Sequence, residues 1–420
     1  MSLTNFSECV IIQPFELKYI LSYGGKIMKK ILSVLLVIAM MFALAACGNN
    51  EKTEEANAIE FKVAMISDYA GITDQSFNQT TWEACLEFGE TTGTEIKYYK
   101  PVTNDTAGRV ASAELAISDG YNVIVMPGYA FAGSVAELSA NYPETKFVAL
   151  DMSAGDLLEA GVSLKGEQYD YNPDNWNLTD YVYMDNVYCA IYQEELSGYM
   201  AGYAAVKLGY TKLGYLGGMA VPAVMRFGYG FVQGADAAAK ELGVEAEMKY
   251  AYGNQFFGDA DLTAVMDTWY SNGTEVVFAC GGSIWSSAAE SAKKYGGKVI
   301  GVDTDQAAII DAQYGDGITI TSAMKGLAPT TIDTLTDVVV NGNWANYAGK
   351  IETLGLFSKD PGANYVQLAP STAFEEGKFS QSDYAALVAA MLDGTVKVSN
   401  DIAAEPVAEA LKITWLGNLK

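Results

Sequence analysis

The chain has 420 residues, of which 50% are hydrophobic, and this length is sufficient for two globular domains. Its 51 acidic residues outnumber 26 basic ones, and the formal charge of -25 argues against a nucleic-acid partner or an anionic lipid surface. The absence of histidine excludes Ser-His-Asp catalysis, Cys-His catalysis and histidine metal sites.

Residues 28–46 have the pattern of a secretion signal. Lys29 and Lys30 precede an apolar run over residues 31–43, which is too short for a membrane span of about 20 apolar residues. The following Leu-Ala-Ala-Cys47 resembles the bacterial lipobox, which implies that Cys47 is lipidated and becomes the first mature residue. An uncleaved anchor is the alternative. Residues 47–58 are polar and lack aromatic rings, which predicts a flexible tether.

Residues 1–27 precede this signal, although a secretion signal begins with its own basic region. Gly24 and Gly25 stand just before Met28, and adjacent glycine codons can form a ribosome-binding sequence. We therefore expect Met28 to be the true start and residues 1–27 to be an untranslated leader read as protein. Peptide mapping of the unprocessed precursor that found residues 1–27 would contradict this.

From residue 61 the chain alternates short apolar strands with helices, which predicts a parallel sheet covered on both faces. The first strand leads into Asp68 and a turn that holds a glycine, an aromatic ring and an amide, at the sheet edge where small ligands bind. Asp105 is expected to cap a helix that stops at Gly120. The predicted elements are strands 61–67, 96–100, 121–126 and 146–150, and helices 79–91, 106–119 and one from 132 onwards.

Residues 166–185 interrupt this alternation with five aromatic side chains among Asn, Pro and Asp. Such a loop either gates a cleft or contacts a partner, or it packs on its own domain. The aromatic residues are Tyr169, Tyr171, Trp176, Tyr181 and Tyr183.

A second unit of the same kind begins at residue 194. Gly198 and Gly202 in its first helix favour close packing, and Ser283 is expected to cap a helix that ends at Gly296. Cys85 in the first unit and Cys280 in the second lie in apolar contexts without a CxxC partner, which predicts buried hydrophobic side chains and no cofactor. The predicted elements are helices 194–208, 227–242 and 283–295, strands 212–217, 246–251, 275–279 and 298–302, and further pieces over 318–340 and from 351.

Two such units in one exported chain predict two lobes that close over a ligand. We expect the chain to cross between the lobes near Asn186, Asp305 and Gly342. The expected lobes are residues 59–186 with 306–342, and residues 187–305 with 343–420.

Four motifs in a fixed order carry a resemblance to a known family. They are Asp74-Gln-Ser-Phe-Asn78, Glu195-Leu-Ser-Gly-Tyr-Met-Ala-Gly202, Leu216-Gly-Gly-Met219 with Pro222 and Phe227, and Gly301-Val-Asp-Thr-Asp-Gln306. Together they resemble the basic membrane protein family of ABC transporter substrate-binding lipoproteins, over roughly residues 61–398. The resemblance implies an α/β fold of two doubly wound, Rossmann-like lobes with a hinge, the type I periplasmic-binding-protein architecture. It also implies a protein anchored outside the cytoplasmic membrane that is not an enzyme.

In the purine nucleoside receptors of that family, two aromatic rings sandwich the base, an acid on the first strand contacts it, and a later acid and a lysine hold the ribose hydroxyls. The matching positions are Asp68, Phe77, Asn78, Phe227, Gly282, Asp303 and Lys325, with Asp151 as a weaker match.

The chemistry of a purine supports these roles independently. Two stacking contacts at about 1–3 kcal/mol each fall short of the about 8 kcal/mol that micromolar affinity requires, so charge-assisted hydrogen bonds of about 1.5–3 kcal/mol must supply the rest. A carboxylate that accepts two neighbouring hydroxyls suits this role, which is the one expected of Asp303. Lys325 follows an apolar strand, where an anionic partner or a ligand is expected.

Each assignment has a structural alternative. Phe77 and Phe227 lie early in helices, where phenylalanine usually belongs to the core, and an acid at a strand end such as Asp303 often caps the next helix. Asp303 and Asp305 also have the spacing of a DxD metal pair, but no third carboxylate is close in sequence.

The leading hypothesis is a receptor that captures guanosine, inosine or adenosine and delivers it to an ABC permease powered by an ATPase. A receptor for a sugar or a signalling molecule, and a nucleoside hydrolase, are the alternatives. Thr73, Asp74 and Gln75 depart from the charged residues usual beside the first motif, which leaves the base preference open. Because Lys325 is the only cation identified near the expected ribose site, nucleosides are expected to bind more tightly than their monophosphates.

Overall fold

The computed structural model describes residues 60–68 and 70–420, and residues 61–420 form one compact unit. The expected leader, signal peptide, lipidation site and tether lie outside the described residues. Among the described helices, none combines the length and the apolar character needed to cross a membrane.

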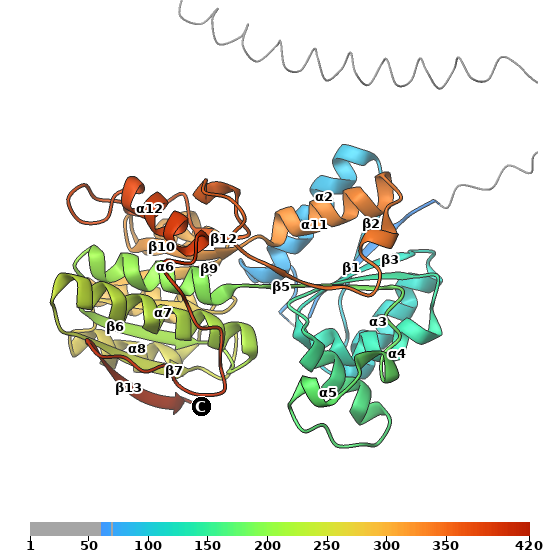
Figure 1. The fold of residues 1–420 in the computed structure, drawn as a ribbon, viewed down its shortest axis with the longest axis horizontal. Helices are drawn as coiled ribbons and strands as arrows, with labels where there is room; N and C mark the ends of the chain where they lie inside the picture. The colour runs from blue at the N-terminus through green and yellow to red at the C-terminus, as the bar shows by residue number, and fades with distance from the viewer. Residues whose placement is uncertain (1–59, 69) are drawn as a thin grey trace, which may run out of the picture. The chain divides into compact units, whose positions relative to one another are not determined.

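The first lobe is built on a six-stranded parallel sheet with the order β11-β5-β4-β3-β1-β2. All four residues of β1 are buried, so both faces of this sheet require a covering layer. Helices α2 and α11 cover one face, and α3, α4 and α5 cover the other (Figure 1). The elements are β1 Val63–Ile66, α2 Phe77–Thr92, β2 Ile96–Tyr99, α3 Thr106–Ser118, β3 Val123–Pro127, α4 Ala132–Asn141, β4 Lys146–Leu150, α5 Ala154–Leu164, β5 Val187–Tyr192, α11 Leu327–Leu335 and β11 Ile351–Leu354.

The second lobe repeats this architecture on a seven-stranded sheet with the order β12-β10-β9-β8-β6-β7-β13, in which only β12 is antiparallel to its neighbour. One face is covered by α6, α7 and α12, and the other by α8, α9 and α10. The elements are α6 Glu194–Lys207, β6 Lys212–Gly217, α7 Pro222–Leu242, β7 Ala246–Tyr252, α8 Ala260–Ser271, β8 Val276–Cys280, α9 Trp285–Tyr295, β9 Lys298–Asp303, α10 Ala307–Tyr314, β10 Thr319–Lys325, β12 Val366–Leu368, α12 Gln381–Leu392 and β13 Leu411–Asn418.

The chain crosses between the lobes later than the sequence predicts. The expected crossing near Asn186 is displaced because β5 pairs with β4 and β11 in the first sheet. The crossing expected near Asp305 follows β10 instead, because β10 pairs with β9 in the second sheet. The last crossing follows β11 rather than Gly342. Sheet pairing therefore moves each crossing toward the carboxyl terminus.

The three crossing segments are hydrogen-bonded to one another. The Gln193 N–H donates to the carbonyl of Leu354 at 2.9 Å, and the Gly326 N–H donates to the carbonyl of Tyr365 at 2.6 Å. The Tyr365 N–H in turn donates to the carbonyl of Gly355 at 3.2 Å. The hinge thus consists of three backbone segments that are joined to one another by hydrogen bonds.

Two predicted helix starts in the second lobe differ from the structure. Helix α7 begins at Pro222 rather than at residue 227, because proline is well suited to the first position of a helix. Helix α9 has Ile284 as its N-cap and no side-chain cap, so the expected cap at Ser283 is wrong. The expected cap at Asp105, which accepts from the Gly108 N–H, is confirmed.

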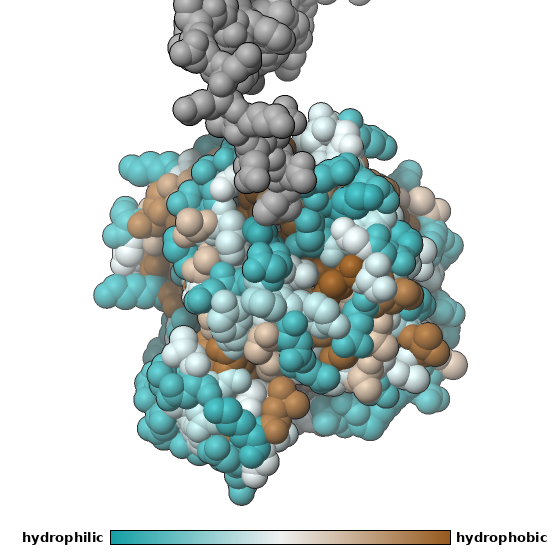
Figure 2. Space-filling view, turned by 90° about the vertical axis from the view of Figure 1, so that its right-hand side faces the viewer, coloured by the Kyte–Doolittle hydropathy of each residue, from teal (hydrophilic) through white to brown (hydrophobic). Residues whose placement is uncertain are grey.

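The aromatic loop at residues 166–185 packs on its own domain. Tyr169, Trp176 and Tyr181 form a small cluster with Leu158 and Val162 of α5. This side of the unit is mostly hydrophilic, with small and separate hydrophobic patches (Figure 2). Of the two interpretations of this loop, packing on its own domain is therefore the one that the structure supports.

The expected burial of Cys85 and Cys280 is confirmed. Cys85, Cys189 and Cys280 are buried and unpaired. Burial raises the pKa of the Cys85 thiol to about 12, so it stays protonated.

Candidate functional site

All eight expected ligand-binding residues border one pocket between the lobes, which holds about 830 Å³ of empty space including its open mouth. They reach it from the carboxyl ends of parallel strands and from the first turns of the helices that follow. The first lobe contributes Asp68, Phe77, Asn78 and Asp151, and the second contributes Phe227, Gly282, Asp303 and Lys325.

Asp68 lies at one end of the pocket in a fixed orientation. Its Oδ1 accepts hydrogen bonds from the Ala70 N–H at 2.8 Å and the Asn78 Nδ2 at 3.0 Å. Asn78 Nδ2 also donates to Asp74 Oδ2, and Asn78 Oδ1 accepts from the Asp68 N–H, so this amide is occupied by protein groups and positions Asp68. Burial raises the pKa of Asp68 to about 6, although these hydrogen bonds favour its ionised form.

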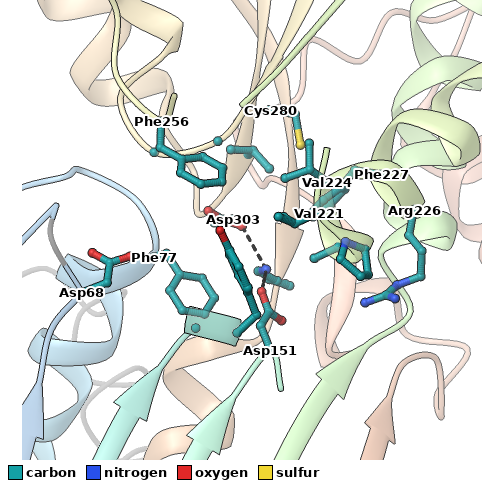
Figure 3. Close-up of a pocket in the computed structure, with 18 of the residues that line it drawn as sticks. Asp68, Phe77, Asp151, Val221, Val224, Arg226, Phe227, Phe256, Cys280 and Asp303 are labelled. Carbon is teal, nitrogen blue, oxygen red and sulfur yellow. Dashed lines mark hydrogen bonds and ion pairs between the residues drawn. The ribbon is translucent and has the colours of Figure 1, made fainter. Parts of the chain in front are cut away.

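Two aromatic rings from different lobes border the pocket and come from outside the core. Phe77 opens α2 in the first lobe, and Phe256 follows β7 in the second (Figure 3). Both side chains are half-buried, whereas Phe227 is 1% exposed and packs edge-to-face on Phe278 at a centroid distance of 6.0 Å. Phe227 also lines the pocket but belongs to the core, so Phe256 is the half-buried phenylalanine that the second lobe contributes to the pocket.

Lys325 connects the two lobes at the floor of the pocket. Its ammonium pairs with Asp151 Oδ2 of the first lobe and lies 3.5 Å from Asp303 Oδ1 and 3.9 Å from Glu194 Oε1 of the second. It also lies 4.6 Å from the centroid of the Phe77 ring. Burial alone lowers the pKa of Lys325, but the three carboxylates raise it above its ordinary value, so the ammonium stays charged.

The backbone at both aspartates is strained in the same way. Asp151 has φ 54° and Asp303 has φ 66°, in the left-handed region that few side chains adopt. Such strain persists only where surrounding structure enforces it, and it is concentrated at functional sites. One oxygen of the Asp151 carboxylate, Oδ1, is buried and accepts no hydrogen bond from any described residue. It is therefore a ready acceptor for a hydroxyl group.

Arg226 is a second cation at the pocket, and the sequence reasoning missed it. It lies in the first part of α7, at the end of the pocket opposite Asp68 (Figure 3). Its Nε donates to Glu194 Oε2 at 2.6 Å, so its charge is largely compensated by a fully buried carboxylate. Burial raises the pKa of Glu194, and Arg226 partly offsets this effect. Lys325 is therefore not the only cation at this site.

The DxD spacing forms no joint site. Asp303 accepts from Ser76 Oγ across the cleft, whereas Asp305 turns away and accepts from Ser371 Oγ at 2.6 Å. Over residues 60–68 and 70–420, no group of three or more acidic or cysteine side chains is placed to hold a metal ion.

Phe256 had a signal in the sequence that motif matching did not use. A Cβ added at Gly218 would lie 2.3 Å from its ring, and one added at Gly281 would lie 2.6 Å from it. These glycines follow strands β6 and β8, so they leave room at the sheet edge for a ring supplied by a neighbouring loop. Glycines at two adjacent strand ends thus indicate that another group approaches this sheet edge closely, but they do not identify Phe256.

Comparison with known proteins places this geometry in a family. Residues 61–368 match the family described as ABC transporter substrate-binding protein PnrA-like. The chain belongs to this family. The match covers both lobes from β1 to β12, and it makes the protein a substrate-binding component of an ABC transporter, which implies permease and ATPase partners.

Curated relatives of this PnrA-like protein have low sequence identity to it, but the similarity extends over most of both chains. The ABC transporter nucleoside-binding protein BmpA of Lactococcus lactis is 24% identical over 348 residues, which cover 78% of this chain and 89% of that protein. A lipoprotein of Pyrococcus abyssi is 25% identical over 349 residues, with coverages of 81% and 77%.

Solved structures agree with the fold. A solute-binding protein of an ABC transporter system from Aeropyrum pernix has a TM-score of 0.57 at 20% identity and covers 81% of this chain and 88% of its own. A second one, from Conexibacter woesei, has the same TM-score at 19% identity, with coverages of 81% and 99%. The two-lobed α/β architecture expected from the sequence is confirmed.

Proposed function

We propose that this PnrA-like protein captures a purine nucleoside outside the cell and delivers it to the permease of an ABC importer. The observation that carries the proposal is that one pocket is lined by a half-buried ring from each lobe, Phe77 and Phe256, together with carboxylates and one lysine. A purine has two flat faces and polar edges, and a ribose has neighbouring hydroxyls, so each part has a matching surface here. The nucleoside-binding relative from Lactococcus lactis supports the same ligand class.

In this proposal the base lies between Phe77 and Phe256, with one edge toward Asp68. The ribose lies over Asp303 and Lys325, and Asp151 Oδ1 accepts a further hydroxyl. Two stacking contacts contribute about 2–6 kcal/mol, and hydrogen bonds to charged groups contribute about 1.5–3 kcal/mol each. Together these terms exceed the about 8 kcal/mol of micromolar affinity before the cost of association is subtracted.

The test is calorimetric titration of the purified protein with guanosine, inosine and adenosine, combined with chromatography of the mixtures. Stoichiometric binding with intact nucleoside supports the receptor. Free hypoxanthine formed from inosine would instead establish a nucleoside hydrolase. Binding of a free sugar with no nucleoside binding would establish the sugar-receptor alternative. The identity of a small molecule that co-purifies with the recombinant protein is an independent check.

We further propose that Cys47 carries a lipid that holds the protein on the outer face of the bacterial cytoplasmic membrane. A single lipidated residue at the start of a polar tether gives attachment without a membrane-spanning helix. We expect Cys47→Ser to move the protein from the membrane fraction to the soluble fraction. A variant that is cleaved after its signal and still remains with the membrane would contradict the lipid anchor.

A further inference from the structure

Ser76 occupies a helix-capping position but does not cap its helix. It is the N-cap of α2, where a serine hydroxyl usually accepts a hydrogen bond from the first turn. Asp74 takes over this role, because its two oxygens accept from the N–H groups of Asn78 and Gln79, each at 2.9 Å. The Ser76 hydroxyl is thereby free, and it donates across the cleft to Asp303 Oδ2 at 2.5 Å.

Gln306 shows the same arrangement from the second lobe. It is the N-cap of α10 and likewise makes no side-chain cap. Its Oε1 accepts from the Val302 N–H at 2.9 Å, and its Nε2 donates across the cleft to the carbonyl of Gln75 at 3.0 Å. Gln75 has φ 56°, a strained conformation that presents this carbonyl to the other lobe. Two helix starts therefore face each other, and the N-cap side chain of each bonds to the opposite lobe instead of capping its own helix.

We propose that Ser76 and Gln306 form a latch between the lobes that sets the orientation of Asp303. Ser76 fixes one oxygen of this carboxylate, and Lys325 lies 3.5 Å from the other. Both latch residues are fully buried, and neither borders the pocket. Ser76 contacts Asp303 directly, whereas Gln306 holds the backbone beside it through the Val302 N–H and also donates to the Gly282 carbonyl at 3.3 Å. This inference rests on the proposed function in one respect only, the assignment of Asp303 to the ribose.

The latch makes the stability of the closed state depend on which ligand is bound. The Ser76–Asp303 hydrogen bond exists only when the lobes meet, so the carboxylate reaches its binding orientation at the moment of closure. A nucleoside that uses Asp303 gains from the latch, whereas a free base that lacks a ribose gains much less. Ser76 thus favours nucleosides over free bases without touching either.

The test compares Ser76→Ala with the wild type by titration with guanosine and guanine. We expect the dissociation constant of guanosine to rise about tenfold, mainly through faster dissociation, because a buried hydrogen bond to a charged group is lost. The dissociation constant of guanine should change much less. Ser76→Thr retains the hydroxyl and should restore most of the affinity.

Ser380→Ala is the matched control. Ser380 is a serine that does cap its own helix, in a capping box with Asp383 at the start of α12, and it does not border the pocket. Its loss should lower the melting temperature and leave guanosine binding unchanged. Ser76→Ala should instead weaken guanosine binding and change the melting temperature little, since Asp74 continues to cap α2.

An unchanged ratio of guanosine to guanine affinity in Ser76→Ala would overturn the role of the latch, while the proposed function would stand as long as the wild type binds guanosine. A wild type that binds no nucleoside would instead remove the proposed function. The latch is then decided by small-angle scattering, where Ser76→Ala and Gln306→Glu should each increase the mean separation of the lobes. Scattering curves identical to that of the wild type would overturn it.

Discussion

Phe77 and Phe256 both have half-buried rings that border the cleft, whereas the ring of Phe227 belongs to the core. We expect Phe77→Ala and Phe256→Ala each to weaken nucleoside binding about tenfold or more, since each removes one stacking face worth about 1–3 kcal/mol. Phe227→Leu should mainly lower stability, because it disturbs the packing on Phe278. Titration calorimetry and thermal melts of the three variants separate the two effects. Unchanged affinity in Phe256→Ala would remove this ring from the site.

Asp68 gives the site a dependence on pH. Burial raises its pKa to about 6, with a smaller upward contribution from Asp74 and a downward one from Arg109. Ligand N–H groups favour the ionised carboxylate, so binding lowers this pKa. Guanosine affinity should therefore be constant above about pH 6 and weaken below it, by at most about tenfold per pH unit for one proton.

Titrations from about pH 5 to about pH 8 check this expectation. Asp68→Asn should bind more weakly at neutral pH and lose the change near pH 6. Asp303→Asn is the control. Burial also raises the pKa of Asp303, but this residue lies in the other lobe, so its variant should keep the change near pH 6. If Asp68→Asn kept the wild-type pH profile, another group would be responsible for it.

At the scale of elements, helices α6 and α7 approach each other through glycine. A Cβ added at Gly202 would lie 2.1 Å from the carbonyl oxygen of Phe231, and one added at Gly234 would lie 2.0 Å from that of Tyr199. We expect Gly202→Ala to destabilise the protein by about 1–3 kcal/mol or more, because the obstacle is backbone that cannot turn aside. Denaturant unfolding measures this cost.

Gly155→Ala is the control for that measurement. Gly155 is also helical, in α5, but a Cβ there would meet its nearest atom at 3.6 Å. It should be neutral or stabilising by up to about 1 kcal/mol, because alanine favours helix over glycine. Equal losses in Gly155→Ala and Gly202→Ala would show that close helix packing is not the cause.

The sequence allowed most elements to be predicted, because apolar runs and their stop signals are local features. The lobe crossings were misplaced because they depend on which sheet a strand joins. Nothing in the sequence of β5 or β10 distinguishes the first sheet from the second, and the choice is made by partners such as β11 that lie far along the chain.

The candidate site divides in the same way. Asp68, Phe77, Asp303 and Lys325 stand at strand ends or helix starts within recognisable motifs, so they were predictable. Phe256 and Arg226 reach the pocket from a loop and from the side of a helix that begins earlier than expected, so their position follows only from the packed structure.

At the scale of the whole molecule, the acidic character extends into the cleft. Among the residues that the structure describes, five aspartates border the pocket against two cations, and both cations already have carboxylate partners. These aspartates are Asp68, Asp74, Asp151, Asp156 and Asp303.

We therefore expect guanosine to bind about a hundredfold more tightly than its monophosphate, whose nearly two negative charges would lose water without gaining a free cation. Side-by-side titrations at two salt concentrations measure the ratio. Comparable affinities would mean that Arg226 exchanges Glu194 for phosphate, and Arg226→Met would then abolish monophosphate binding selectively.

The order of the strands along the chain also determines when each lobe can finish folding during synthesis. The edge strand β11 that completes the first sheet ends at residue 354, 162 positions after β5 ends at residue 192. At about 5–20 residues per second, synthesis leaves the edge of β5 unpaired for about 10 to 30 seconds. The second sheet waits still longer, because its outer strand β13 lies at Leu411–Asn418. The first lobe stays incomplete until residue 354 has been made and the second until residue 418, so the expected amino-terminal export signal emerges long before either fold is finished.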